Sequence, residues 1–105
     1  MTVLAPSLRQ LPARVISEAT GATVRSAQRW RAGVAPRRRA YRVRLDEAAA
    51  TLELLGPGMS AGARQAWMTG QSAYLGWRRP VDLLAAGEFD RVRGAALAYA
   101  AGDVT

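Results

Sequence analysis

Arginine side chains are concentrated in the first 44 residues of the chain, and this clustering indicates a surface for a polyanion. Residues 1–44 hold ten arginines and a single carboxylate, Glu18, which gives a net charge of +9. Residues 45–105 hold five arginines and seven carboxylates, a net charge of −2, which completes the total of +7. A basic half joined to a mildly acidic half indicates two roles, the first of them contact with DNA.

Nine polar and basic side chains in this first part are candidate DNA contacts. Arginine can form two hydrogen bonds with guanine in the major groove, whereas arginines in loops more often contact phosphates. Thr23, Arg25, Ser26 and Arg29 are expected to contact bases, with Gln28 on the flank of the same helix. The full candidate set is Thr23, Arg25, Ser26, Gln28, Arg29, Arg31, Arg37, Arg38 and Arg39. The alternative is an ordinary helical hairpin whose basic face is merely solvated.

The segments that carry these residues have the pattern of two helices joined by a short turn. Apolar residues at helical spacing between Leu11 and Ala19 predict a first helix, with Pro12 in its first turn and Gly21 just past its end. Thr23 can cap a second helix by accepting a hydrogen bond from a backbone N–H. The sequence therefore predicts a helix-turn-helix.

The second helix, which ends at Gly33, is predicted to bury one face and expose the other. Its apolar stripe consists of Val24, Ala27 and Trp30, and Trp30 is expected to pack in the core. At roughly 100° per residue, Arg25 and Arg29 point away from this stripe. A helix that offers two arginines opposite its buried face suits the recognition helix of a helix-turn-helix.

The rest of the chain also predicts helices, because β-branched residues are sparse and never alternate over a strand length. A basic loop spans 34–40, and further helices are expected over 41–55, after a Ser60 cap, over 81–86 and over 89–101. Their expected inward residues include Tyr41, Leu45, Ala48, Ala49, Leu52 and Leu55, then Ala63, Ala66 and Trp67, and finally Phe89, Val92, Ala96 and Tyr99.

The expected fold is therefore all-α, an N-terminal helix-turn-helix-like unit packed with a C-terminal helical unit. Gly56-Pro57-Gly58 is the clearest boundary, which divides the chain into units of residues 1–56 and 57–105.

Composition argues against catalysis and against a metal site. Cysteine and histidine are both absent, which removes disulfides, thiol chemistry and the usual zinc ligands. No two carboxylates are spaced as an acid–base pair, and no phosphate-binding loop is present. We therefore expect no enzyme activity, no metal and no cofactor. Without an apolar run of membrane length or a signal peptide, we expect a cytoplasmic protein.

Four of the seven aromatic residues lie within 23 positions of the C-terminal half: Trp67, Tyr74, Trp77 and Phe89. They can all be buried in the core. The alternative is that Trp77 forms a protein-binding surface with its neighbours Arg78 and Arg79, because tryptophan and arginine are enriched at the energetic centres of interfaces.

The same segment resembles a known family, the toxin-binding domain of the Xre/MbcA/ParS antitoxins. The resemblance lies in Trp67-Met68, Tyr74-Leu75-Gly76, Arg79-Pro80-Val81-Asp82-Leu83-Leu84, Gly87-Glu88-Phe89-Asp90-Arg91-Val92 and Gly102. The N-terminal half resembles the helix-turn-helix that precedes this domain, so that the resemblance covers roughly residues 11–103. Two departures are Gly70-Gln71-Ser72, where the family often has asparagine, and an N-terminus too short and Pro-interrupted for a full set of helices before Leu11.

The resemblance implies an antitoxin that occludes the active site of a RES-domain, NAD-degrading toxin and represses its own operon by binding operator DNA. It implies a homodimer or a toxin–antitoxin hetero-oligomer without a cofactor. Pro80, Asp82, Leu83 and Leu84 would be structural. The toxin contacts would be Trp77, Arg78, Arg79, Ala101, Gly102, Asp103, Val104 and Thr105. The alternative is a small helix-turn-helix repressor without a toxin partner, whose C-terminal half serves only dimerisation.

Overall fold

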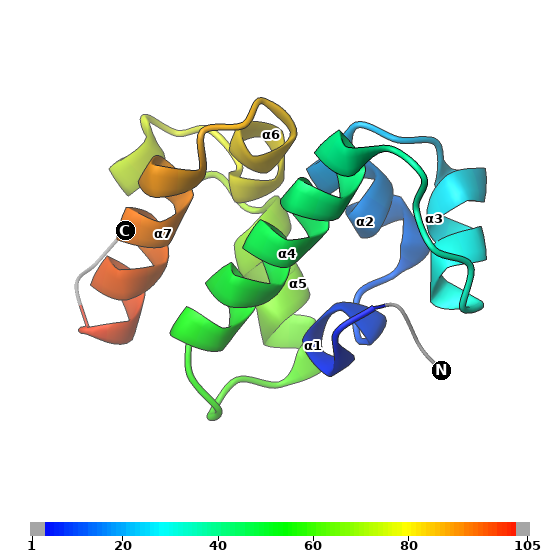
Figure 1. Cartoon of the computed structure of the whole chain (residues 1–105). Helices are drawn as coiled ribbons and strands as arrows, with labels where there is room; N and C mark the ends of the chain where they lie inside the picture. Colours follow the sequence, from blue (N-terminus) through cyan, green and yellow to red (C-terminus); the bar gives the residue numbers. More distant parts are fainter. Residues whose placement is uncertain (1–3, 103–105) are drawn as a thin grey trace.

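The computed structural model describes residues 4–102, and its elements are helices. Within this range there are seven α-helices and one 3-10 helix, and no strand element, as the sequence predicted (Figure 1). In chain order they are α1 (Pro6–Arg9), α2 (Ala13–Thr20), α3 (Val24–Arg31), α4 (Arg39–Leu54), α5 (Ala61–Thr69), η1 (Ala73–Leu75), α6 (Pro80–Ala85) and α7 (Phe89–Ala100).

The longest helix, α4, crosses the molecule and separates the α2–α3 side from α7 (Figure 1). α2 packs against α3 and α6, while α4 packs against α7, α2 and α1. α5 completes the interior by packing on α6. In this arrangement α3 lies at one end of the molecule and α7 at the other (Figure 1), and the start of α4 reaches both α3 and the first residue of α7.

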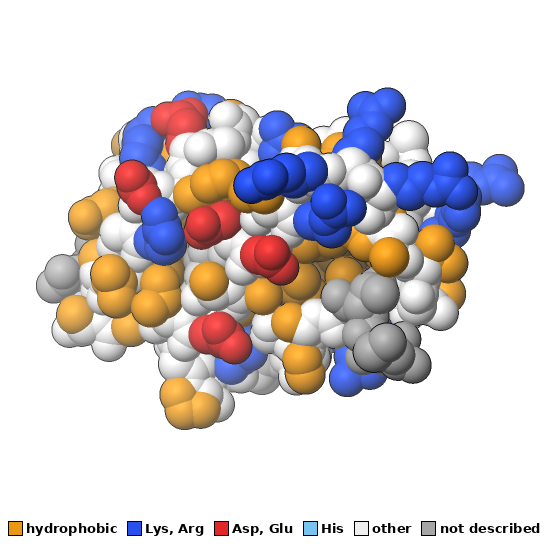
Figure 2. All heavy atoms as spheres, in the orientation of Figure 1, with side chains coloured by type: hydrophobic (Ala, Val, Ile, Leu, Met, Phe, Trp, Pro, Cys, Tyr) orange, Lys and Arg blue, Asp and Glu red, His pale blue; other side chains and the backbone are white. Residues whose placement is uncertain are grey.

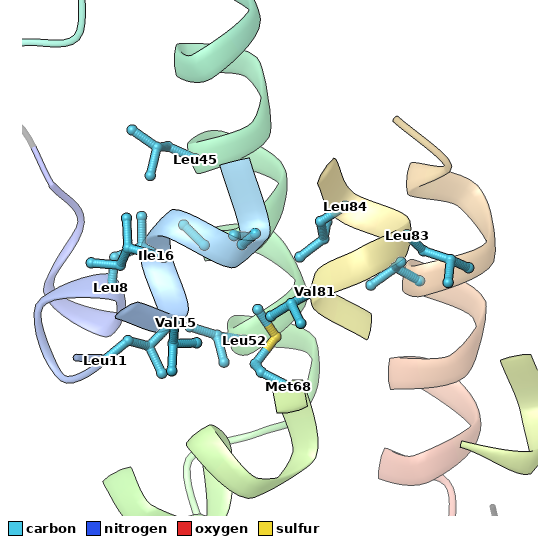
Figure 3. Close-up of a cluster of buried hydrophobic side chains, with 14 of the residues drawn as sticks. Leu8, Leu11, Val15, Ile16, Leu45, Leu52, Met68, Val81, Leu83 and Leu84 are labelled. Carbon is cyan, nitrogen blue, oxygen red and sulfur yellow. The ribbon is translucent and has the colours of Figure 1, made fainter. Parts of the chain in front are cut away.

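One continuous hydrophobic cluster holds these helices together and draws on the chain before and after Gly56-Pro57-Gly58 (Figure 3). Each fully buried Leu, Ile, Val or Met side chain contributes about 1.5–3 kcal/mol relative to exposure. The largest fully buried members of the cluster include Leu11, Val15, Ile16, Leu52, Met68, Leu75, Val81, Leu83, Leu84 and Val92.

The helix boundaries follow the capping signals in the sequence. The Oγ1 atom of Thr23 accepts a hydrogen bond from the Ser26 N–H at 3.0 Å, and the Oγ atom of Ser60 accepts one from the Ala63 N–H at 3.1 Å. Gly21 closes α2 with a φ of 80°, a conformation that costs other residues energy. The predictions of both caps and of this glycine end are confirmed.

The segment before Leu11 forms only one short helix, α1, in agreement with the prediction that it is too short for a full set of helices; Pro6 is compatible with its first turn, and Leu4 and Leu8 bury their side chains beside α4. One prediction about helix positions is wrong. α4 begins at Arg39 rather than at residue 41, so Arg39 belongs to a helix and not to the basic loop.

Two predictions of inward-facing residues are also wrong. In α5 the buried residue is Met68, whereas Ala63 and Ala66 are exposed, because Met buries far more apolar area than Ala does. In α7 the buried face consists of Val92, Ala95, Ala96 and Ala98, and Tyr99 is 41% exposed.

Candidate functional site

The turn between α2 and α3 is fixed by side-chain hydrogen bonds. Thr20, fully buried, donates its hydroxyl to the Ile16 carbonyl at 2.8 Å and accepts from the Ala22 N–H at 3.2 Å. The Ser17 hydroxyl donates to the Ala22 carbonyl at 2.5 Å. Arg44 of α4 donates to the Thr20 carbonyl at 3.0 Å, which satisfies a carbonyl at the end of α2. These bonds give α3 a defined orientation relative to α2 and α4.

The buried face of α3 is narrower than the sequence predicted. Ala27 and Trp30 are buried, which confirms the core role of Trp30, but Val24 is 41% exposed. The Trp30 ring lies 5.5 Å from the Tyr41 ring, centroid to centroid, so that α3 leans on the start of α4. The prediction that Val24 belongs to the buried stripe is therefore wrong.

The nine candidate DNA contacts form a polar surface on and beside α3. Eight of them are exposed and Ser26 is half-buried. The hydroxyls of Thr23 and Ser26 are hydrogen-bonded to each other at 3.0 Å, so both belong to the N-terminal cap of α3. Arg31 donates to the Arg9 carbonyl at 3.3 Å. Figure 2 shows arginine side chains gathered over α3 and the start of α4.

None of the six arginines in this surface has a counter-ion within residues 4–102. Among the described residues, five of them form neither an ion pair nor a hydrogen bond through their side chains: Arg25, Arg29, Arg37, Arg38 and Arg39. The guanidinium group of Arg38 lies 5.7 Å from the centre of the Tyr41 ring. Positive charge without internal compensation produces the electrostatic potential that an anionic partner requires.

A second candidate surface lies in the C-terminal half, around the loop that follows α5. Trp77 is 65% exposed and has a φ of 67°, the only positive φ at a non-glycine residue within the described range. Its N–H donates to the Ser72 carbonyl at 2.7 Å, and the Ser72 N–H donates to the Arg78 carbonyl at 3.1 Å. These two bonds hold the loop closed and keep Trp77 in a conformation that costs a bulky residue energy.

Exposed apolar side chains extend from this loop along α7. Tyr74 and Leu97 are each 55% exposed. The Tyr74 ring lies against α7 at Gly94, where an added Cβ would lie 3.4 Å from the Tyr74 hydroxyl. Tyr99 stands edge-on to Trp67 at 6.4 Å between centroids, beside a cavity of about 350 Å³. The aromatic residues are thus divided between core and surface.

Arg79 is held within the chain by two carboxylates. Its guanidinium group donates to both carboxylate oxygens of Asp82 at 2.9 and 2.8 Å, and to Glu18 of α2 at 3.1 Å. The hydrogen bond with Arg79 lowers the pKa of the Asp82 carboxyl and raises the pKa of Arg79 itself. This cluster connects α2 with the start of α6.

Arg78 is held by a separate cluster at the start of α7. It pairs with Glu88 at 3.3 Å, and Arg91 pairs with the same carboxylate at 3.0 Å. The hydrogen bond from Arg91, reinforced by the charges of Arg91 and Arg78, lowers the pKa of Glu88. Both clusters leave the arginines beside Trp77 electrically compensated.

The predicted toxin contacts do not all fall within the described range. Trp77, Arg78 and Arg79 are consecutive in the loop before α6, and Ala101 and Gly102 are exposed after α7. Asp103, Val104 and Thr105 lie outside the described residues. Sequence reasoning missed Leu97 as a surface residue; the signal was its place on the face of α7 opposite the small residues Ala95 and Ala96.

Two kinds of site are absent from the described part of the chain. No group of His, Cys, Asp and Glu residues there could hold a metal ion. None of its helices is long and apolar enough to span a bilayer.

Comparison with known proteins gives one informative similarity. No family model matches the sequence, and no curated protein does. Among solved structures, the chain is similar to the antitoxin in the crystal structure of the M. tuberculosis MbcT-MbcA toxin-antitoxin complex, with 28% sequence identity and a TM-score of 0.71. The match covers 94% of this chain and 91% of that one. In sequence and in fold, the chain is thus similar to the MbcA-type antitoxins, as its sequence predicted.

Proposed function

We propose that the chain is the antitoxin of a toxin–antitoxin pair whose toxin is a RES-domain protein that degrades NAD. The similarity to an antitoxin over 94% of the chain carries this proposal. The antitoxin acts by covering the active site of the toxin, in a homodimer or a toxin–antitoxin hetero-oligomer. Occlusion requires no catalytic residue and no cofactor, and the chain contains neither cysteine nor histidine.

The exposed apolar side chains of the C-terminal half support a protein partner. Trp77, Tyr74 and Leu97 are each more than half exposed, and burial of such side chains drives association. Trp77 also retains a positive φ, and a strained backbone at an exposed aromatic residue is typical of a binding site. We assign Trp77, Arg78 and Arg79 to the toxin interface, together with the tail from Ala101 to Thr105.

Co-expression with the RES-domain protein encoded beside its gene tests the proposal. We expect the two proteins to co-purify and NAD consumption by the toxin to be suppressed. The matched control pair is Trp77→Ala, which removes an exposed apolar side chain from the C-terminal surface, and Val24→Ala, which removes one from α3. An active toxin that neither binds the wild-type chain nor is inhibited by it would overturn the proposal.

DNA binding is a second function, favoured by the arginines of α3 and the adjoining loop that have no internal counter-ion. Such a surface fits the phosphates of operator DNA, and we propose that the antitoxin represses its own operon. The test is a mobility shift with the DNA upstream of the gene, with and without the toxin. If neither state binds the fragment, this second function is wrong, and the alternative of a helix-turn-helix repressor without a toxin partner falls with it.

A further inference from the structure

The exposure of Val24 changes which side chains of α3 point away from the protein. With only Ala27 and Trp30 buried, the outward direction of the helix passes close to Arg25, at roughly 100° per residue. Gln28 and Arg29 then lie about 50° to either side of that direction. Arg29 is on the side of Ser26, which faces the start of α4. Arg25 and Arg29, both predicted to contact bases, therefore point in different directions. Arg25 points away from the protein, and Arg29 points toward the side of α4.

Arg29 lines a cleft between α3 and α4 that does not include Arg25 or Gln28. The cleft has a volume of about 270 Å³, and its lining residues are Ser26, Arg29, Trp30, Val34, Ala35, Arg37, Arg38 and Tyr41. None of these residues is acidic. Trp30 and Tyr41 provide aromatic surface, while Arg29, Arg37 and Arg38 supply three guanidinium groups without a carboxylate partner in the described chain.

The start of α4 borders the same cleft through Arg38 and Tyr41. Arg38 is the N-cap residue of α4 and makes no side-chain cap hydrogen bond, and the first turn contains no acidic residue. The first N–H groups of a helix lack partners within the helix and carry a partial positive charge. Arg38 and Tyr41, which flank these groups, both line the cleft. A helix terminus beside a cleft lined by three arginines suits a phosphate group.

We infer that this cleft binds one phosphate of the DNA backbone through Arg29, Arg37 and Arg38, and that Arg25 and Gln28 contact the bases. The inference rests on the proposed DNA-binding function and deepens it. Two neighbouring arginines of one helix then have different roles, since Arg29 contributes to affinity for any duplex, whereas Arg25 contributes to the choice of sequence. Gln28 can form two hydrogen bonds with adenine, as Arg25 can with guanine.

Duplex binding by the full chain, measured by fluorescence anisotropy at several salt concentrations, tests this assignment. The probes are a 20-bp duplex of scrambled sequence and a duplex of the same length from the promoter. Arg29→Ala and Arg38→Ala should each weaken both duplexes by the same factor, about 5- to 10-fold, and should each reduce the log–log salt slope by about one. Arg25→Ala is the matched control and should weaken only the promoter duplex.

Arg38→Lys tests whether the effect of Arg38→Ala is purely structural. Because it keeps the positive charge, it should retain the salt slope of the wild-type chain. If Arg29→Ala weakens only the promoter duplex, or leaves the salt slope unchanged, Arg29 does not contact a phosphate and the inference is wrong. If the wild-type chain binds neither duplex at low salt, with or without the toxin, the cleft inference and the DNA-binding function both fail. The same protein preparation is also tested for inhibition of the toxin. If it inhibits the toxin but binds no DNA, the antitoxin function stands and only the DNA-binding function fails.

Discussion

The arginines of the two halves of the chain differ in whether they pair with carboxylates. Within the described residues, Arg14 alone among the ten arginines up to Arg44 pairs with a carboxylate, at 3.8 Å from Glu18. In the C-terminal half, Arg78, Arg79, Arg91 and Arg93 all form ion pairs, and Arg64 donates to a backbone carbonyl. The same residue type is therefore mostly without a carboxylate partner in one half and mostly ion-paired within the fold in the other.

Exposed aromatic side chains are distributed in the opposite way to the unpaired arginines. The most exposed aromatic side chains, Trp77 and Tyr74, lie in the half whose arginines are neutralised, whereas Trp30 is buried beneath the uncompensated arginines. Exposed ion pairs contribute little stability, but they remove net charge from the surface around Trp77. Such a surface favours apolar association with a protein, while the opposite end favours a polyanion.

Salt should separate the two surfaces most strongly. If five phosphates are neutralised, duplex affinity falls about 500-fold between 50 and 200 mM salt, because the free energy gained by releasing counterions from DNA decreases as the salt concentration rises. We expect affinity for the toxin to change by less than about 3-fold over the same range, because its interface relies on apolar burial. Anisotropy for the duplex and calorimetry for the toxin measure the two. If duplex affinity and toxin affinity depend equally on salt, the two surfaces do not differ in the way proposed.

Replacing Trp77 by alanine should damage only the C-terminal surface. An aromatic residue at the centre of an interface contributes about 2 kcal/mol, so we expect toxin binding to weaken about 30-fold. The midpoint of thermal unfolding and duplex affinity should stay unchanged, because the side chain is 65% exposed and does not line the cleft beside α3. If Trp77→Ala binds the toxin as tightly as Val24→Ala does, the interface lies elsewhere.

Sequence reasoning was accurate where short-range chemistry decides the outcome. The caps at Thr23 and Ser60, the glycine end of α2 and the burial of Trp30 each depend on a few neighbouring residues, and all of them are confirmed. The separation of a basic end from an aromatic one was also visible in the charge count of the two halves.

The errors arose where tertiary contacts decide the outcome. Val24 has the correct spacing for the buried stripe of α3, but no helix of the described chain packs over that edge, so it is exposed. The cleft beside Arg29 depends on how close the start of α4 lies to α3, and no local pattern encodes that distance. The clusters of Arg78 and Arg79 were missed for the same reason, since Glu18 is 61 positions from Arg79.

Acid should weaken the internal pairing of the C-terminal half. Because Arg79 lowers the pKa of Asp82 in the folded chain, the pair stabilises the fold above the unfolded pKa of about 3.9. That contribution is lost as the pH falls through the lower, folded value. Asp82→Asn should cost about 1 kcal/mol or less at pH 7, since both side chains are partly solvated, and the difference should shrink below about pH 4.

Urea unfolding at pH 7, 5 and 3 measures this effect, with Asp46→Asn as the control. Asp46 is an exposed aspartate that has no ion pair in the described chain, so its replacement reports the loss of one negative charge alone. If Asp82→Asn and Asp46→Asn follow the same pH profile, the Arg79 cluster contributes nothing to the connection between α2 and α6.

The smallest effect concerns how far the apolar surface extends along α7. Gly94→Ala should stabilise the fold by about 0.5 kcal/mol, because glycine inside a helix costs conformational entropy. The new Cβ would lie 3.4 Å from the Tyr74 hydroxyl, at the edge of ordinary contact, so Tyr74 can keep its place. If the toxin contacts only the Trp77 loop, affinity should change by less than about 2-fold. A loss of 10-fold or more, with the fold intact, would place Tyr74 and the outer face of α7 inside the interface.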